Sequence, residues 1–105
     1  MRIYLAGPMS GIKAHNFPAF HARAAELRVQ GYDVVNPAEL DDGDASKPWE
    51  HYMRRDLALL VTCDAVALLP GWQASRGATL EVHVANALGM PVLDAETMEP
   101  CKEAV

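Results

Sequence analysis

The chain has 105 residues, half of them hydrophobic, and a formal net charge of -5. This length and composition predict one globular domain over residues 1–105 rather than a disordered segment. An acidic chain lacks the basic face that a nucleic-acid duplex or an anionic membrane surface requires, so neither is expected as a partner. A small nucleotide is not excluded, because a few backbone N–H groups are enough to hold it.

Cysteine usage and hydropathy indicate a cytoplasmic protein. Cys63 and Cys101 belong to no CxxC motif and no His/Cys cluster, as expected for reduced thiols. The first apolar stretch is followed at once by Gly7-Pro8 and is too short for the hydrophobic region of a signal peptide. No apolar run approaches the roughly 20 residues of a transmembrane helix. We therefore expect a soluble protein of the cytoplasm.

The first third of the chain predicts strand, helix and strand. Residues 3–6 are apolar and predict a buried strand that stops at the glycine-bounded loop Gly7–Gly11. Asn16 is the expected helix N-cap, because apolar residues recur at helical spacing after it. Gly31 is expected to end this helix. Residues 32–36 then predict a second short strand.

The rest of the chain repeats the alternation. The acidic stretch 40–46 lacks the ligand spacing of a calcium loop and is expected to be a solvated loop. A second helix is predicted from Ser46 or Lys47 to Cys63-Asp64. The apolar run 65–69 predicts a third strand covered on both faces. A third helix over 76–88 and a fourth strand over 91–93 follow, and a short terminal helix is expected beyond them.

This order predicts an α/β fold: a three-layer, doubly wound parallel sheet of four to five strands, flavodoxin- or Rossmann-like. In such sheets ligands bind beyond the carboxyl ends of the strands, where the strand order reverses. Three segments are expected to meet there: the loop Gly7–Gly11, the segment after Asn36, and Pro70–Gly77.

A carboxylate follows the third of these segments. Glu81 lies four residues after Gly77, so a stripe of Gly77, Glu81, Val84 and Leu88 is predicted, with Gly77 leaving room above Glu81. Burial raises the pKa of a carboxyl there, and the N-terminal end of the helix lowers it. A glutamate that stays ionised yet poorly hydrated is a competent nucleophile. The alternative is a surface acid in the first helical turns. Periodicity alone leaves both interpretations open.

Other candidate site residues also have two interpretations. Ser75 is either the N-cap of the third helix or, with the N–H groups after it, part of an anion site. Asp56 either reaches the pocket or is a surface partner of Arg54 or Arg55. Tyr4 is on a central strand, and its hydroxyl needs a partner when buried. The four histidines show no ligand spacing such as HExxH, so no metal is predicted.

Taken together, several motifs resemble the nucleoside 2-deoxyribosyltransferase superfamily, and most of all its short DUF4406-like branch. The motifs are Tyr4-Leu5-Ala6-Gly7-Pro8, Asp56 upstream of Cys63-Asp64-Ala65-Val66, and Ser75-x-Gly77-x-x-x-Glu81. The resemblance implies cleavage of the N-glycosidic bond of a 2′-deoxynucleoside or its 5′-monophosphate. It implies that Glu81 is the nucleophile, that Asp56 assists at the sugar and base, and that Tyr4 positions Glu81. The residues implied to line the ligand site are Gly7, Met9, Ser10, Gly11, Ser75 and Gly77.

The resemblance also bears on the substrate. The position six before the glutamate resembles a serine in monophosphate-hydrolysing members and an aspartate in nucleoside-transferring members. Here it is Ser75, so we predict a preference for a 5′-monophosphate. The chain departs from the family in two places. Only Lys13 lies near the first loop, which is arginine-rich in the monophosphate branch. The tail Glu96–Val105 has no clear equivalent of the residue that a neighbouring subunit contributes.

Three classes of function remain open on the sequence. The first is an N-glycosidic transferase or hydrolase acting on a small nucleoside or nucleotide. The second is a non-catalytic nucleotide-binding module of the same fold, and the third is a small structural or interaction protein. No metal or organic cofactor is required by the glutamate mechanism. The resemblance implies a homo-oligomer, a dimer or higher.

Overall fold

The computed structural model describes residues 1–40 and 46–104. Strands and helices alternate along these residues. The strands are β1 (Arg2–Ala6), β2 (Asp33–Val35), β3 (Ala65–Leu68) and β4 (Val92–Asp94), and the α-helices are α1 (Phe17–Val29), α2 (Trp49–Leu60) and α3 (Arg76–Ala87). A short 3-10 helix, Lys102–Ala104, stands where a terminal helix was expected. Most of the predicted acidic loop, residues 41–45, lies outside the described residues.

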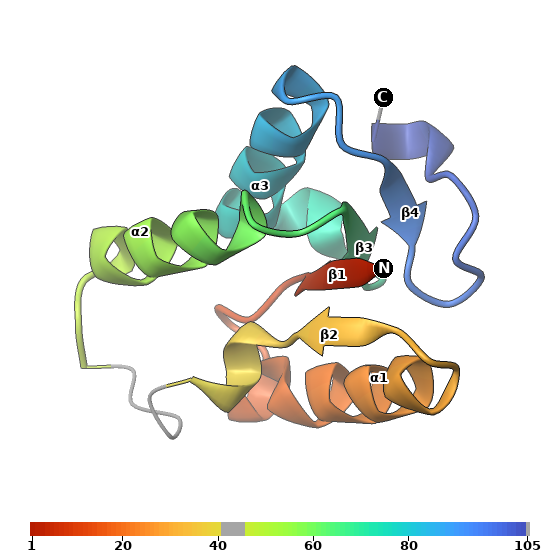
Figure 1. Cartoon of the computed structure of the whole chain (residues 1–105). Helices are drawn as coiled ribbons and strands as arrows, with labels where there is room; N and C mark the ends of the chain where they lie inside the picture. Colours follow the sequence, from red (N-terminus) through yellow and green to blue (C-terminus); the bar gives the residue numbers. More distant parts are fainter. Residues whose placement is uncertain (41–45, 105) are drawn as a thin grey trace.

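The strands form one parallel sheet in the order β2-β1-β3-β4. Helix α1 covers one face of this sheet, and α2 and α3 cover the other (Figure 1). The order reverses between β1 and β3, as in doubly wound folds. The predicted α/β fold class is therefore confirmed, with four strands in the described part of the chain.

Central strand β1 supplies side chains to both hydrophobic layers. Successive residues of a strand point to opposite faces, so Ile3 and Leu5 pack with Phe20 on the α1 side. Tyr4 and Ala6 pack on the other side, beneath α2 and α3. All four residues Ile3–Ala6 are at most 1% exposed. A tyrosine in this row must find a partner for its hydroxyl inside the protein.

The start of α1 differs from the prediction. Helix α1 begins at Phe17, but Asn16 makes no capping bond from its side chain. Its Nδ2 instead donates to the carbonyl of Pro8 at 3.0 Å. Ala14, His15 and Asn16 all have left-handed backbones, with φ of 54°, 53° and 61°. Asn16 thus occupies the predicted N-cap position, but its amide ties the first loop to the helix instead of making a capping bond.

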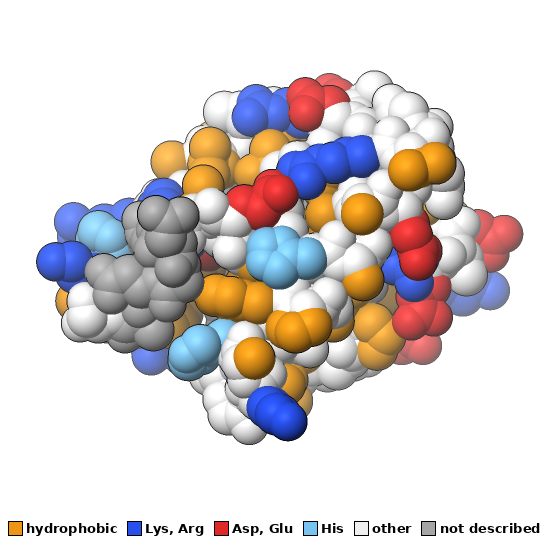
Figure 2. Space-filling model, turned by 90° about the horizontal axis from the view of Figure 1, so that it is seen from below, with side chains coloured by type: hydrophobic (Ala, Val, Ile, Leu, Met, Phe, Trp, Pro, Cys, Tyr) orange, Lys and Arg blue, Asp and Glu red, His pale blue; other side chains and the backbone are white. Residues whose placement is uncertain are grey.

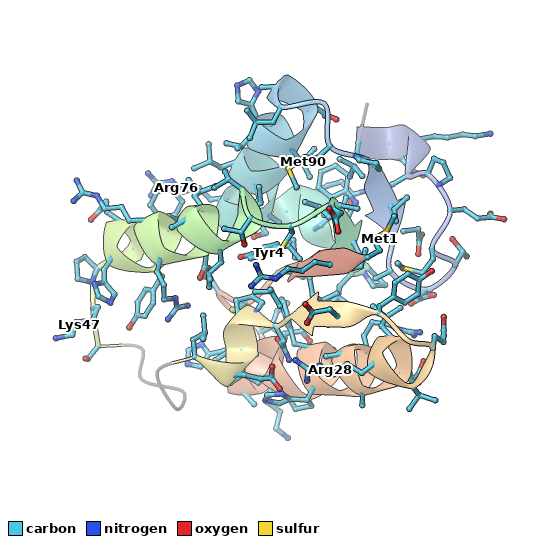
Figure 3. All side chains as sticks on the ribbon, in the orientation of Figure 1. Met1, Tyr4, Arg28, Lys47, Arg76 and Met90 are labelled. Carbon is cyan, nitrogen blue, oxygen red and sulfur yellow. The ribbon has the colours of Figure 1, made fainter. Side chains whose placement is uncertain are left out.

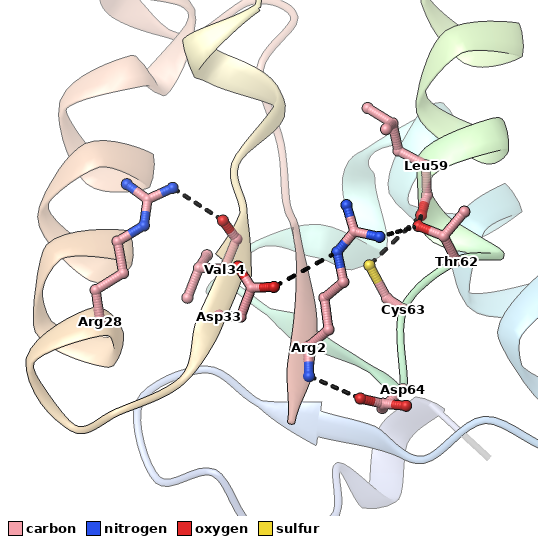
Figure 4. A network of polar contacts seen from close by, with 8 residues as sticks. All are labelled: Arg2, Arg28, Asp33, Val34, Leu59, Thr62, Cys63 and Asp64. Carbon is pink, nitrogen blue, oxygen red and sulfur yellow. Dashed lines mark hydrogen bonds and ion pairs between the residues drawn. The ribbon is translucent and has the colours of Figure 1, made fainter.

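The amino ends of the strands are tied together by polar contacts (Figure 4). The backbone N–H of Arg2 donates to Asp64 at 2.7 Å, and its Nη1 donates to Thr62 Oγ1 at 2.7 Å. Its Nε lies 3.8 Å from Asp33 on β2. This network joins β1 to its neighbours at the edge opposite the predicted site, so Asp64 has a structural role.

The molecular surface over α1 carries no large patch of one kind. Seen from that side, hydrophobic, acidic, basic and histidine side chains are interspersed (Figure 2). Within residues 1–40 and 46–104, none of the helices combines the length and the apolar character of a membrane span. The polar groups with unusual surroundings lie inside the molecule, between the sheet and the layer of α2 and α3.

Candidate functional site

A buried hydrogen bond joins β1 to α3. The Tyr4 hydroxyl donates to Glu81 Oε2, although the two residues are 77 positions apart in the sequence. Tyr4 is fully buried and Glu81 is 5% exposed. Figure 3 labels Tyr4 in the interior, between β1 and the helices α2 and α3. Of the two sequence interpretations, the structure therefore supports the buried Glu81 and not the surface acid.

The buried face of α3 is not the predicted stripe. Its buried residues are Ala78, Glu81, Val82 and Ala85. Leu88, which was predicted to continue the stripe from Glu81, is 57% exposed. The prediction is wrong at this end because the face that packs on the sheet follows the small apolar residues. Glu81 is the polar member of that face.

Gly77 has a different role from the one expected. A Cβ atom added at Gly77 would lie 3.1 Å from Met53 Sδ and 3.9 Å from Trp49 Nε1. Contacts as short as 3.1 Å are tighter than ordinary van der Waals packing. The room that Gly77 was predicted to leave above Glu81 is bounded by Met53, and the glycine lets α3 approach α2 closely.

Asp56 pairs with Arg55, as one of its sequence interpretations predicts, but it is buried and not on the surface. The residue is 9% exposed, on the inner side of α2. Arg55 donates from Nε and Nη2 to the same oxygen, Asp56 Oδ1, at 3.0 and 2.9 Å. The negative charge of Asp56 acts on both Glu81 and Tyr4. The three residues predicted to be catalytic are therefore brought together from β1, α2 and α3.

Burial decides the charge of Glu81. Desolvation raises the pKa of its carboxyl to about 8, against the hydrogen bond from Tyr4, and the charge of Asp56 adds to the rise. Desolvation and the same two carboxylates raise the pKa of Tyr4 well above its ordinary value, so its hydroxyl remains a donor. Of the two opposing effects considered from the sequence, burial is the one that acts most strongly on the pKa of Glu81, so the carboxyl holds its proton at neutral pH.

Ser75 begins α3. Its Oγ accepts from the N–H of Ala78 at 3.1 Å, which confirms the predicted N-cap. A capping hydroxyl still has its own proton to donate. The first turn of α3 contains no acidic residue, so nothing in it opposes an anion. The guanidinium of Arg76, which sequence reasoning passed over, lies 3.7 Å from the Trp49 ring centroid.

The predicted first loop meets the turn after β3. A Cβ at Gly7 would lie 2.8 Å from Leu69 Cβ, and one at Gly71 would lie 3.4 Å from Pro8 Cγ. These contacts confirm that the loop Gly7–Gly11 and the segment Pro70–Gly77 lie side by side at the carboxyl edge.

Other expected members of the edge lie apart from Glu81. Met9 packs against the hydrophobic cluster on the α1 side of the sheet, the face opposite Glu81. Ser10 and Gly11 are exposed. The amide of Asn36 is buried, accepts from the N–H of Ala38 at 3.0 Å and lies 3.3 Å from His21 Nδ1. Met9 and Asn36 thus lie at the carboxyl ends of β1 and β2, away from the Tyr4–Glu81 hydrogen bond.

The linings of two surface hollows show how Tyr4, Asp56 and Glu81 lie relative to the surface. One is at the carboxyl ends of β3 and β4 and is lined by residues 68–73, Asp94, Glu96, Cys101 and Glu103. The other lies along α2 and is lined by Pro48, Glu50, His51, Arg54 and Arg55. Neither lining includes Tyr4, Asp56 or Glu81, so the carboxylates lie beneath the surface. In the part of the chain that the structure describes, no three His, Cys, Asp or Glu side chains are grouped to hold a metal ion.

The fold and the buried cluster define an α/β protein with a tyrosine–carboxylate site between the sheet and one helical layer. The sequence profile of DUF4406, a domain of unknown function, matches residues 1–94. The chain therefore belongs to the DUF4406 family. A search of curated protein sequences finds no match.

A solved structure shares this fold. It comes from a characterisation of the 2-deoxyribosyltransferase of the psychrotolerant bacterium Bacillus psychrosaccharolyticus, described as a biocatalyst for nucleoside synthesis. The TM-score is 0.68 at 22% sequence identity, over 89% of this chain and 70% of that chain. At this identity the similarity establishes the fold, and the chemistry has to be argued from the residues.

Proposed function

We propose that this protein cleaves the N-glycosidic bond of 2′-deoxynucleosides or their 5′-monophosphates, with Glu81 as the nucleophile. The observation that carries the proposal is the buried hydrogen bond from Tyr4 to Glu81, with Asp56 close enough to act on both. A buried carboxylate held by a tyrosine and flanked by a second carboxylate suits a two-step displacement at a sugar carbon. The shared fold of a 2-deoxyribosyltransferase adds support.

The proposed reaction has two displacements. Ionised Glu81 attacks the anomeric carbon, a C–O ester bond forms, and the C–N bond to the base breaks through an oxocarbenium-like transition state. The base leaves with the electron pair of that bond and takes up a proton. A water or a second base then attacks the same carbon and releases the Glu81 carboxylate. Attack by water completes hydrolysis, and attack by a base completes transfer.

Each neighbouring residue has a role in this scheme. Tyr4 orients Glu81 through its hydroxyl and keeps its own proton, because its pKa is raised. Asp56 accepts a hydrogen bond from a sugar hydroxyl or relays a proton from water to the leaving base. Glu81 must first lose the proton that it holds at neutral pH. The reaction is therefore expected to accelerate as the pH rises toward about 8.

Ser75 supports a preference for the 5′-monophosphate. Its hydroxyl caps α3 and can still donate, and the unpaired N–H groups of the first helical turn favour an anion. An aspartate at this position would repel a phosphate. A comparison of kcat/KM for a deoxynucleoside and its monophosphate tests this preference, and equal or better turnover of the nucleoside would refute it.

The test of the proposed activity is release of free base from a mixture of deoxynucleosides and deoxynucleotides. Wild-type protein should release one or more bases, whereas Glu81→Gln should release none and still bind the ligand in a thermal-shift assay. Glu81→Gln keeps the size of the side chain and its ability to accept from Tyr4. Base release by the variant at the wild-type rate would contradict the proposal.

The second candidate is a nucleotide-binding module without turnover. The protonated state of Glu81 at neutral pH and its 5% exposure favour this candidate. Two measurements distinguish the enzyme from the binding module. A binding module shows a thermal shift with nucleotides but releases no base even at pH 8 to 9. A structural or interaction protein would show no thermal shift with any nucleoside or nucleotide.

A further inference from the structure

Arg55 lines the surface hollow along α2 and also contacts the carboxylate of Asp56. Two of its N–H groups donate to one oxygen, Asp56 Oδ1, at 3.0 and 2.9 Å. The Arg55 side chain is 25% exposed and that of Asp56 is 13% exposed. Ion pairs this far from water are screened less than surface pairs. Removal of one partner would therefore leave the other as a poorly compensated charge.

The guanidinium of Arg55 is held in a defined position. Adjacent residues on a helix do not face each other, so Arg55 has to turn back to reach Asp56. Its Cζ lies 5.4 Å from the ring centroid of Tyr52, one turn earlier on α2. The Tyr52 hydroxyl in turn accepts from the N–H of Lys47 at 3.0 Å. Contacts thus run from Lys47, just before α2, through Tyr52 and Arg55 to Asp56.

These contacts bring a positive charge close to the buried carboxyl groups. The groups that act on each other in the cluster are Tyr4 of β1, Glu81 of α3, and Asp56 and Arg55 of α2. Ionisation of both carboxyls would place two negative charges together in a desolvated space, which is unfavourable. Among the described groups that act on Tyr4, Arg55 is the cation. Its charge offsets one of the two carboxylates.

We propose that Arg55 is a positioning residue: its guanidinium fixes the orientation of the Asp56 carboxylate and offsets the charge of that carboxylate, so that Glu81 can lose its proton beside it. The catalytic consequence rests on the proposed function, but the effect on the two carboxyl groups does not. Sequence reasoning had treated Arg55 only as a surface partner of Asp56. In the structure it is the link between solvent and the site.

The test compares Arg55→Gln with Arg54→Gln. Arg54 is exposed and adjacent, so the control removes the same charge without touching the Asp56 contact. Carboxyl carbons of Glu and Asp are labelled with ¹³C and titrated by NMR, with Glu81→Gln to assign the signal. The two carboxyls are coupled, so their apparent pKa values are read as those of a pair.

We expect Arg55→Gln to raise the apparent pKa values of the pair by about one and Arg54→Gln to leave them at the wild-type values. Equal titrations in the two variants would overturn the inference. Should Arg55→Gln fail to fold, Tyr52→Leu removes the ring beneath the guanidinium and keeps both charges of the ion pair. A smaller rise is expected in Tyr52→Leu, and an unchanged titration there would overturn the inference as well.

A kinetic readout separates this inference from the proposed function. In a turning-over enzyme, a pKa higher by one lowers the ionised fraction of Glu81 about tenfold. The kcat of Arg55→Gln at pH 7 should therefore fall about tenfold with a smaller change in KM, and the acid limb of its pH profile should move to higher pH. If Arg55→Gln is active and the acid limb of its pH profile stays where it is in wild type, the inference about Arg55 is rejected and the proposed function is not. No turnover by wild type, with altered NMR titrations in Arg55→Gln, would reject the proposed function alone.

Discussion

At the scale of single residues, the unusual feature is an acid that burial keeps protonated. Desolvation raises the pKa of Glu81 to about 8, and Tyr4 donates to it from the central strand. A protein gains no stability from such an arrangement at neutral pH, because ionisation of a buried carboxyl is costly. Perturbed pKa values of this kind are common where chemistry occurs.

The raised pKa of Glu81 makes stability depend on pH. A raised folded-state pKa favours the folded state fully below the ordinary value near 4.5, and this contribution is lost as pH rises through about 8. A tenfold difference in proton affinity between the folded and unfolded states is worth about 1.4 kcal/mol. Glu81→Gln removes the titrating carboxyl. The free energy of unfolding of the variant, measured relative to that of wild type, should therefore increase by several kcal/mol between pH 5 and pH 8. Urea unfolding at both pH values measures this, and a constant difference between the two proteins would argue against a raised pKa.

Loss of the Tyr4 hydroxyl should make Glu81 still harder to ionise. Tyr4→Phe leaves the ring in the core but removes the donor to Glu81. The hydrogen bond opposes the rise in the pKa of Glu81, so that pKa should climb further in the variant. We expect the pH at which activity reaches half its maximum to move upward. An activity profile identical to wild type would show that Tyr4 does not act on Glu81.

At the scale of elements, the site depends on how closely α2, α3 and the two edge turns approach. Gly7 lies against Leu69 Cβ and Gly77 lies against Met53 Sδ. Both glycines have backbone angles that any residue can adopt. The effect of a substitution therefore depends on the atoms that an added Cβ would meet. The neighbour of Gly7 is attached directly to backbone, whereas the neighbour of Gly77 is the end of a flexible side chain.

Alanine at these two glycines should therefore have different effects. Gly7→Ala places its Cβ 2.8 Å from Leu69 Cβ and should destabilise the fold by about 1–3 kcal/mol. Gly77→Ala meets Met53 Sδ, which can move, and gains up to about 1 kcal/mol in helix propensity, so it should be close to neutral. Chemical denaturation of both variants provides the measurement. A larger loss at Gly77 than at Gly7 would show that the packing at the two turns has been misjudged.

Ser75 caps α3, and in the proposed function it also bears on the choice of substrate. Ser75→Ala removes the cap of α3 and should lower the free energy of unfolding by about 1 kcal/mol. It should also weaken binding of a 5′-monophosphate more than that of the nucleoside. Ser75→Thr keeps the hydroxyl and serves as the control. An equal loss for both ligands would confine Ser75 to capping.

At the scale of the whole molecule, the sequence predicted the layers better than the site. Alternating apolar runs and helical spacing predict a doubly wound parallel sheet, because each pattern reflects local geometry. The small apolar residues Ala78, Val82 and Ala85 also marked the true inner face of α3. The predicted stripe was counted from Gly77, so it continued to Leu88 and not along these small apolar residues.

Other features could not be predicted from local patterns. The bond from Asn16 to Pro8 and the close approach of Met53 to Gly77 depend on how separate segments pack. The pKa of Glu81 depends on how three elements exclude water, which no spacing rule gives. The grouping of Tyr4, Asp56 and Glu81 was reached through the family resemblance, since periodicity alone left two of them undecided.

The assembly of the molecule follows as a prediction at this scale. The family resemblance implies a homo-oligomer, and the exposed apolar residues Val61 and Leu88 are 52% and 57% accessible in the single chain. Sedimentation velocity over a range of concentrations should show a dimer or larger species. A single monomeric species at micromolar concentration would contradict this expectation.

The most direct measurement of the central claim is the mass of the protein after rapid acid quench from a reaction with deoxynucleotides at pH 8. If Glu81 is the nucleophile, the intact protein should carry one added deoxyribosyl or deoxyribosyl-phosphate group, mapped by peptide analysis to Glu81. Glu81→Gln should carry none under the same conditions. Base release without any adduct on wild type, or an adduct on a residue other than Glu81, would contradict the proposed role of Glu81.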